Sequence, residues 1–112
     1  MNSQYKTIML RKIVTDDIDT LLALTGNPEV IRHIPGMIQD REYATSWIAG
    51  LTQYDHECMI LLDGSVIGEC SLTVKGDSGE IGLMIFPEFW RKGYGTETVR
   101  LLMDMAISLG LK

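Results

Sequence analysis

One short segment combines two glycines and two cations just before a predicted helix; its residues are Trp90, Arg91, Lys92, Gly93, Tyr94, Gly95 and Thr96. The glycines permit backbone angles that other residues disfavour, and they leave no side chain to obstruct a ligand. Successive amide N–H groups can then point into one concavity at the positive end of the following helix. Together with the charges of Arg91 and Lys92, they predict binding of a phosphate or pyrophosphate group.

Two other phosphate-binding patterns fit this segment less well. The dinucleotide pattern GxGxxG fails because Thr98 stands at the third glycine position. The Walker pattern fails because no Gly-Lys-Ser/Thr follows the glycines. A lone Gly-x-Gly can also be only a turn, so the meaning of the loop depends on the elements around it.

A strand and a helix must position this loop. The strand is predicted over Glu80–Phe86, and Pro87 ends it. It is apolar on both faces except at Glu80, which predicts a place inside a sheet rather than at its edge. The helix is predicted from about Thr96 to Leu109, with Gly110 as its C-terminal cap. Its predicted buried positions are Val99, Leu102, Met103, Ala106 and Leu109.

The upstream chain supplies a further strand and three helices. Thr7–Ile13 has the residue types of a strand. Capping residues at 15–17 start a helix that Gly26-Asn27 ends, and Asp40 caps a later one with Tyr43 and Trp47 at helical spacing. Between them Pro28 starts a short helix that Pro35-Gly36 stops.

A hairpin follows these helices. The strands Cys58–Leu62 and Ser65–Val74 are separated by Asp63-Gly64, a dipeptide that tolerates the positive φ angles of a tight turn. Residues 75–79 form a second turn before the Glu80–Phe86 strand. The predicted fold class is therefore α/β, or more narrowly α+β, with a mainly antiparallel sheet flanked by helices in a single domain.

Composition limits the possible functions. The chain has 112 residues, is 46% hydrophobic and carries a formal net charge of -5. The acidic balance argues against a nucleic-acid surface, and no apolar run approaches the roughly 20 residues of a membrane span. Cys58 and Cys70 are too few for a disulfide-built fold, which predicts a reducing, cytoplasmic setting, and no spacing suggests a metal site.

The run from Glu80 to Glu97 resembles motif A of the GNAT acetyltransferase superfamily, and most closely the branch of ribosomal-protein N-terminal acetyltransferases. The family pattern is Gln/Arg-x-x-Gly-x-Gly/Ala. Gly93 and Gly95 match it, while Trp90 stands where Gln or Arg is usual. The order of the upstream elements matches as well, so the resemblance covers essentially the whole chain.

The resemblance implies transfer of an acetyl group from acetyl-CoA, as co-substrate, to a primary amine. The loop would hold the pyrophosphate, and the backbone of Leu83, Met84 and Ile85 would bind the pantetheine arm as an added strand does. Gly82 would mark a bulge that aims these amides at the thioester.

The amine must lose a proton before it attacks the thioester. The resemblance places this base at Glu80, where burial would make the carboxylate a stronger base. Glu69, on the neighbouring strand, is the weaker candidate. The acceptor is a protein N-terminus, a polyamine or antibiotic, or a small metabolite amine, and the acidic balance favours a cationic one.

Domains of this family continue after the last helix predicted here, with a further strand, a helix and a final strand pair. The tyrosine often proposed as general acid lies in that part. We therefore expect either a truncated domain or a second copy that completes the sheet, which predicts self-association. The alternative function is a non-catalytic CoA-binding or dimerisation module.

Overall fold

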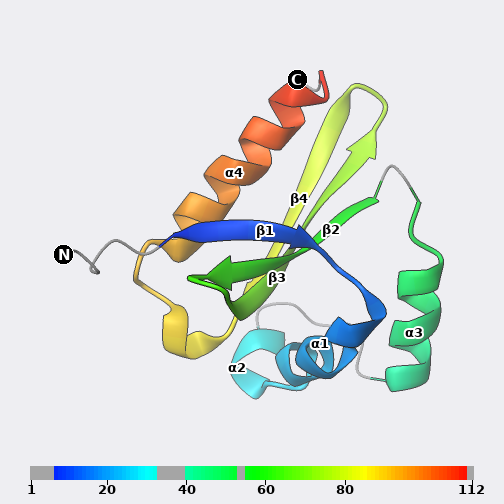
Figure 1. Cartoon of the computed structure of the whole chain (residues 1–112), viewed down its shortest axis with the longest axis vertical. Coiled ribbons are helices and arrows are strands. Elements are labelled where there is room, and N and C mark those ends of the chain that lie inside the picture. Colours follow the sequence, from blue (N-terminus) through cyan, green and yellow to red (C-terminus); the bar gives the residue numbers. More distant parts are fainter. Residues whose placement is uncertain (1–6, 33–39, 53–54, 111–112) are drawn as a thin grey trace.

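The computed structural model describes residues 7–32, 40–52 and 55–110. It has one antiparallel sheet in the order β1-β2-β3-β4, with helices on both faces (Figure 1). In chain order the elements are β1 (Ile8–Lys12), a 3-10 turn (Thr15–Asp17), α1 (Ile18–Thr25), α2 (Pro28–Ile31), α3 (Arg41–Ala49), β2 (Asp55–Leu62), β3 (Ser65–Lys75), β4 (Ser78–Ile85), a second 3-10 turn (Pro87–Phe89) and α4 (Tyr94–Ser108). The predicted fold class is confirmed.

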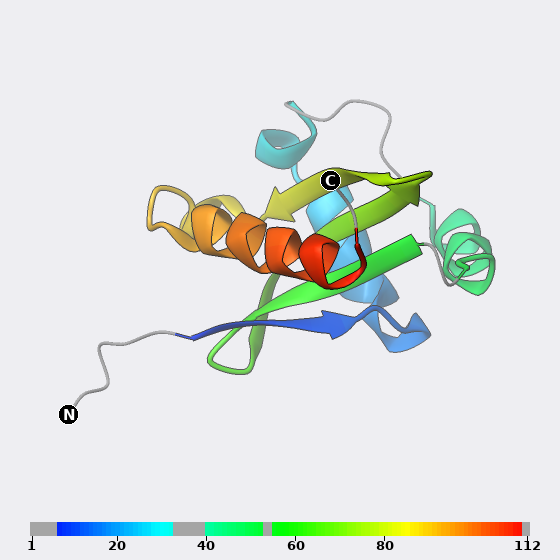
Figure 2. The ribbon, with the colours of Figure 1, turned by 90° about the horizontal axis from the view of Figure 1, so that it is seen from above.

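The sheet separates two hydrophobic clusters. One face packs against α4, and the other packs against α1, α2 and α3, an arrangement that can be followed from above in Figure 2. Cross-strand neighbours share a face because side chains alternate along each strand. Cys58, Cys70 and Leu83 lie on the α4 face, whereas Met59, Glu69 and Met84 lie on the face of the first three helices.

The predicted helix starts have their physical causes in capping side chains. Asp40 accepts hydrogen bonds from the amides of Glu42 and Tyr43. Asn27, the residue before Pro28, accepts one from the amide of Glu29. These bonds satisfy amides that have no partner inside the helix. The predicted stop at Pro35-Gly36 lies outside the described residues.

The predicted hairpin turn is confirmed. Asp63 and Gly64 have φ angles of 51° and 90°, the positive values that a tight two-residue turn requires. Strand β2 begins three residues earlier than predicted, at Asp55, because its polar first residues still pair with β3. A bulge between Ile60 and Leu61 disturbs the register near this turn.

The prediction that the Glu80–Phe86 strand lies inside the sheet was wrong for the described sheet. Strand β4 pairs with β3 on one side only and is therefore an edge. Its first residues are exposed, including Ile81, which is 41% exposed. The apolar residues indicate how hydrophobic the strand is, but they do not indicate whether a second strand pairs with it.

The predicted buried face of α4 was partly wrong. Leu102 is buried, but Met103 and Leu109 are exposed. Leu101 and Met105 pack against the sheet instead, and Thr98 is fully buried because its hydroxyl donates to the Tyr94 carbonyl at 2.8 Å. Because the threonine hydroxyl has a hydrogen-bond partner, its burial costs little free energy. The buried face of α4 is therefore rotated around the helix relative to the predicted face.

The two cysteines are buried and unbonded on the α4 face, as expected for small core residues. A hydrogen bond between them lowers the pKa of Cys58 and raises that of Cys70. Among the described residues, no cluster of metal-ligating side chains and no helix able to span a membrane is found.

Candidate functional site

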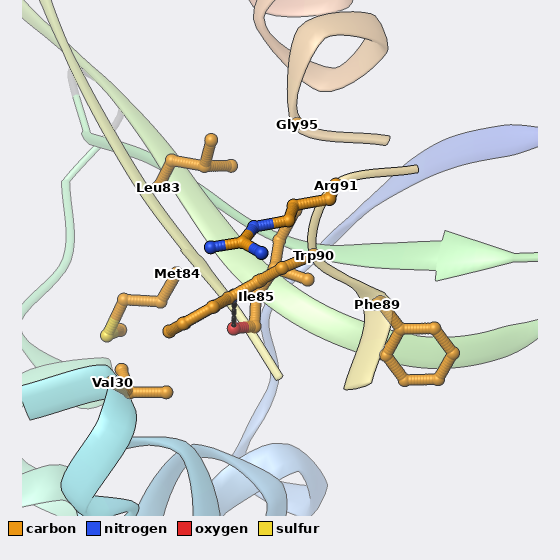
Figure 3. Close-up of a pocket in the computed structure, with 8 residues that line it drawn as sticks. All are labelled: Val30, Leu83, Met84, Ile85, Phe89, Trp90, Arg91 and Gly95. Carbon is orange, nitrogen blue, oxygen red and sulfur yellow. Dashed lines mark hydrogen bonds between the residues drawn. The ribbon is translucent and has the colours of Figure 1, made fainter. Parts of the chain in front are cut away.

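A pocket of about 250 Å³ lies where β4 ends and α4 begins. Gly95 and Val30 lie at opposite ends of it, and the Arg91 guanidinium is directed toward β4 (Figure 3). Six of its lining residues were predicted as binding residues: Leu83, Met84, Ile85, Trp90, Arg91 and Gly95.

The loop is held in an unusual backbone conformation. Gly93, the residue before α4, has a φ of 85°, and Arg91 has a φ of 62° although it is not glycine. Such angles cost a residue with a side chain roughly 1–2 kcal/mol and are concentrated at functional sites. Gly95, in the first turn of α4, lines the pocket, and the first amides of a helix lack partners within the helix.

Trp90 ties the loop to the end of the strand. Its indole Nε1 donates to the Ile85 carbonyl at 2.7 Å, a bond drawn in Figure 3. Trp90 also packs with both hydrophobic clusters, so its ring spans the edge of the sheet. The residue that departs from the family pattern thus has a structural role in fixing the loop against β4.

Near the pocket, the backbone N–H and C=O groups of β4 that point away from β3 belong to Leu83 and Ile85; we call them the outward backbone groups. The Phe86 amide donates to Ile67 at 2.9 Å, so Phe86 faces β3. Because the N–H and C=O of one residue point to the same side in an antiparallel ladder, Met84 also faces β3 and its neighbours face the free edge. Of the three predicted pantetheine-binding residues, Met84 therefore contributes its side chain rather than its backbone to the pocket.

The bulge expected at Gly82 is absent. Gly82 pairs with Ser71 in an unbroken register from Gly68–Ile85 to Lys75–Ser78. A Cβ at Gly82 would stand 2.7 Å from Ser71 Oγ, which explains glycine at this position by close packing. Gly68 is tighter still, because its Cβ would stand 2.2 Å from the Met84 carbonyl oxygen.

The burial expected for Glu80 was wrong. Its side chain is 69% exposed and pairs with Lys75 at 3.2 Å. It lies at the start of β4 and is not a lining residue of the pocket, so the apolar environment that would strengthen the base is missing. Its role as the base stays a prediction.

The buried carboxyl of the region is Glu69. It is only 5% exposed, and its Oε2 has no hydrogen-bond partner among the described residues. Burial, then a hydrogen bond to Glu57 and the charge of Glu57, raise the pKa of Glu69 to about 11. A carboxyl in this state is protonated at neutral pH, and it can donate to the carboxylate of Glu57.

Several predicted binding residues lie outside the pocket wall. Lys92, Gly93, Tyr94 and Thr96 occupy the loop and first turn of α4 but do not line the cavity, and Tyr94 packs against the α4-side core. Val30 and Phe89 line it without having been predicted as site residues. Val30 reaches the pocket because α2 lies close to the end of β4, and no local sequence pattern predicts this contact.

Comparison with known families decides the assignment. Residues 7–112 match the family described as the acetyltransferase (GNAT) domain. The chain belongs to the GNAT acetyltransferase family. The match includes the whole strand–loop–helix unit around the pocket and all four strands, so it identifies the protein as an N-acetyltransferase of this family and confirms the resemblance to the GNAT superfamily. No protein of curated function matches the chain at significant sequence similarity.

Solved structures share the fold at low sequence identity. A domain from Methanocaldococcus jannaschii is 24% identical with a TM-score of 0.83, over 96% of this chain and 75% of that one. The PaiA N-acetyltransferase from Thermoplasma acidophilum, solved with coenzyme A, is 17% identical with a TM-score of 0.73, over 94% and 75%. RimL, a ribosomal L7/L12 alpha-N-protein acetyltransferase, is 17% identical with a TM-score of 0.79, over 95% and 64%.

Proposed function

We propose that this GNAT-family chain transfers an acetyl group from acetyl-CoA to a primary amine at the pocket between β4 and α4. One observation carries the proposal. The outward backbone of Leu83 and Ile85 and the glycine loop line the same pocket, so an extended arm and an anionic group attached to it can be held together. This is the combination that a pantetheine arm ending in a pyrophosphate requires.

Gly95 supplies a test of fit. A Cβ there would stand 3.6 Å from Leu83 Cδ2, which is ordinary contact, and Gly95 lies within α4 without a positive φ angle. Neither its backbone nor its packing therefore demands glycine. Because Gly95 lines the pocket, a side chain would instead take up space needed by a ligand close to the helix start.

Different groups of the chain would bind different parts of acetyl-CoA. The amides at the start of α4 and the Arg91 and Lys92 cations would hold the pyrophosphate. The outward amides of Leu83 and Ile85 would hold the arm in extended form, and one of them can stabilise negative charge developing on the thioester oxygen. The Ile85 carbonyl is already engaged by Trp90, so Leu83 offers the outward carbonyl that accepts no hydrogen bond from the described residues.

The experiment is a calorimetric titration that compares CoA with pantetheine. Both carry the arm, but pantetheine lacks the pyrophosphate. We expect CoA to bind and pantetheine to bind far more weakly, with affinity for CoA falling as salt rises because the loop contact is ionic. Equal affinity for the two ligands, or no binding of CoA, contradicts the proposal.

Turnover separates the enzyme from its alternative. With acetyl-CoA and a panel of peptide N-termini, polyamines and small amines, release of free CoA identifies the acceptor class. Binding of CoA without turnover on the panel identifies a non-catalytic CoA-binding module instead. The cytoplasmic setting proposed from the two free cysteines agrees with either outcome.

We also propose that the free edge of β4 mediates self-association. The described sheet ends there, with Ile81 exposed and two outward backbone groups near the pocket. An unpaired edge with apolar side chains favours pairing with another chain. Sedimentation should show dimers at micromolar concentration and fewer of them with CoA, which would occupy the same edge; only monomer without CoA would refute this.

A further inference from the structure

The chain makes a tight turn directly after β4, and a side chain closes it. The amide of Phe89 donates to the carbonyl of Phe86 at 2.9 Å, and the next amide donates to the carbonyl of Pro87 at 3.0 Å. The indole Nε1 of Trp90 then donates back to the carbonyl of Ile85 at 2.7 Å (Figure 3). These three bonds hold the whole turn against the end of the strand.

The ring of Trp90 is itself firmly placed. It packs against both hydrophobic clusters, one on each side of the sheet, and it lines the pocket. A tryptophan side chain has only two torsions, so it loses less rotamer freedom on being fixed than the Gln or Arg usual at this position. The indole N–H therefore stands at a defined place relative to β4.

Beyond Trp90 the loop has little backbone support. Among the described residues, no backbone–backbone hydrogen bond joins Arg91 or Lys92 to the rest of the chain, and the next such bond runs from Glu97 to Gly93 at the start of α4. Arg91 nevertheless has a φ of 62°, which is disfavoured for a residue with a side chain. The anchors on either side must hold this conformation, and Trp90 is the anchor on the strand side.

The same bond relates the loop to the strand edge. The Ile85 carbonyl is the outward backbone group nearest to the loop, and the indole of Trp90 occupies it. A ligand along the edge is left with the groups of Leu83 and the Ile85 amide. It must then turn away from the strand at Ile85 and enter the loop. One hydrogen bond thus fixes the distance between the groups that would hold the arm and those that would hold the pyrophosphate.

We propose that Trp90 is a positioning residue for CoA, whose indole N–H, bonded to the Ile85 carbonyl, holds the glycine loop in its binding shape before the ligand arrives. The arm and the pyrophosphate are then bound as one unit. This inference rests on the proposed function, and it concerns how the two parts of that site are joined.

The proposal has a specific consequence for affinity. Two linked parts of one ligand reinforce each other only when their subsites stand at the separation that the ligand spans. Loss of the indole N–H lets the loop move relative to β4. It should therefore weaken CoA, which spans both subsites, and leave each half of CoA bound as before.

The test is an NMR titration of the whole ¹⁵N-labelled chain with three ligands: CoA, pantetheine for the arm and ADP for the pyrophosphate. Amide signals of Leu83 and Gly95 report the two subsites. We expect Trp90→Phe to bind CoA about tenfold more weakly, the factor that one hydrogen bond is worth. Its affinities for pantetheine and ADP should equal those of wild type.

Two further variants are matched to this one. Trp47→Phe makes the same change on α3, at a partly buried residue that packs against the helix-side cluster and does not line the pocket. It should bind all three ligands as wild type does. Trp90→His should recover part of the CoA affinity, because histidine Nε2 stands at the ring position of the indole Nε1 and can donate the same bond.

The free protein gives an independent measurement. Without ligand, ¹⁵N relaxation should show the amides of Lys92 and Gly93 more mobile in Trp90→Phe than in wild type. In wild type, the indole N–H signal of Trp90 should be protected from solvent exchange before and after CoA binds. The chain has two tryptophans, so Trp47→Phe assigns this signal.

The outcomes separate the two proposals. If wild type does not bind CoA, the proposed function fails and this inference fails with it. If wild type binds CoA and Trp90→Phe binds it equally well, or loses pantetheine and ADP to the same degree, the proposed function stands and this inference is overturned. A freely exchanging Trp90 indole N–H in wild type overturns it as well, even if Trp90→Phe does not fold.

Discussion

The loop at residues 90–96 and the carboxyl groups of Glu69 and Glu80 are built differently. The loop presents backbone amides, held by positive φ angles at Arg91 and Gly93. The carboxylates are side chains whose protonation depends on burial and on one another, as at Glu69. The first region should therefore be sensitive to shape, and the second to charge.

The largest effect should come from Gly93→Val. A β-branched residue is strongly disfavoured at a φ of 85°, so the loop must change shape and CoA binding should be lost in calorimetry. Gly64→Val is the matched control, because Gly64 has a φ of 90° and also has open space around it. Both should lose roughly 1–2 kcal/mol of stability, but only Gly93→Val should lose CoA. Retained affinity would show that the loop is only a turn.

A smaller effect should follow from Glu80→Gln. The change removes the carboxylate that the family resemblance implies as base, so we expect lower turnover, and CoA affinity should stay nearly intact because Glu80 does not line the pocket. The measurement is kcat/KM for an accepted amine together with calorimetry. Unchanged turnover would remove Glu80 from the catalytic step.

The smallest effect on function should come from Asp17→Asn, which lies outside the loop and does not line the pocket. Asp17 accepts two hydrogen bonds from Arg11, at 2.9 and 3.0 Å, and one from the Val14 amide at 2.8 Å. The bond to Arg11 lowers the pKa of Asp17, so its stabilisation is present above the ordinary value of 3.8 and is lost as pH falls through the lowered pKa.

Asp17→Asn should cost roughly 1–2 kcal/mol in urea unfolding at pH 7, since hydrogen bonds to charged groups are worth about that much. The difference from wild type should shrink at pH values below the lowered pKa. CoA affinity should not change at pH 7. A constant difference across the whole pH range would mean that the carboxylate charge is not the cause.

Local sequence was enough to predict the backbone conformation of the loop and of the turn and helix start described above. The Asp63-Gly64 turn, the cap at Asp40 and the left-handed glycine before α4 each follow from one or two residues, because the φ restriction and the missing helical partners act locally. The loop's glycines and cations also predicted where a pyrophosphate would lie.

Only the tertiary structure decided how the strands bring side chains together. Sequence analysis identified Glu80 and Glu69 as candidate carboxylates on neighbouring strands, but cross-strand register and burial put Glu80 in solvent and Glu69 in the core beside Glu57. The same holds for Val30, which reaches the pocket from α2, and for β4, whose edge position depends on its neighbours. The desolvation of a group depends on every segment packed around it, and those segments are distant in the chain.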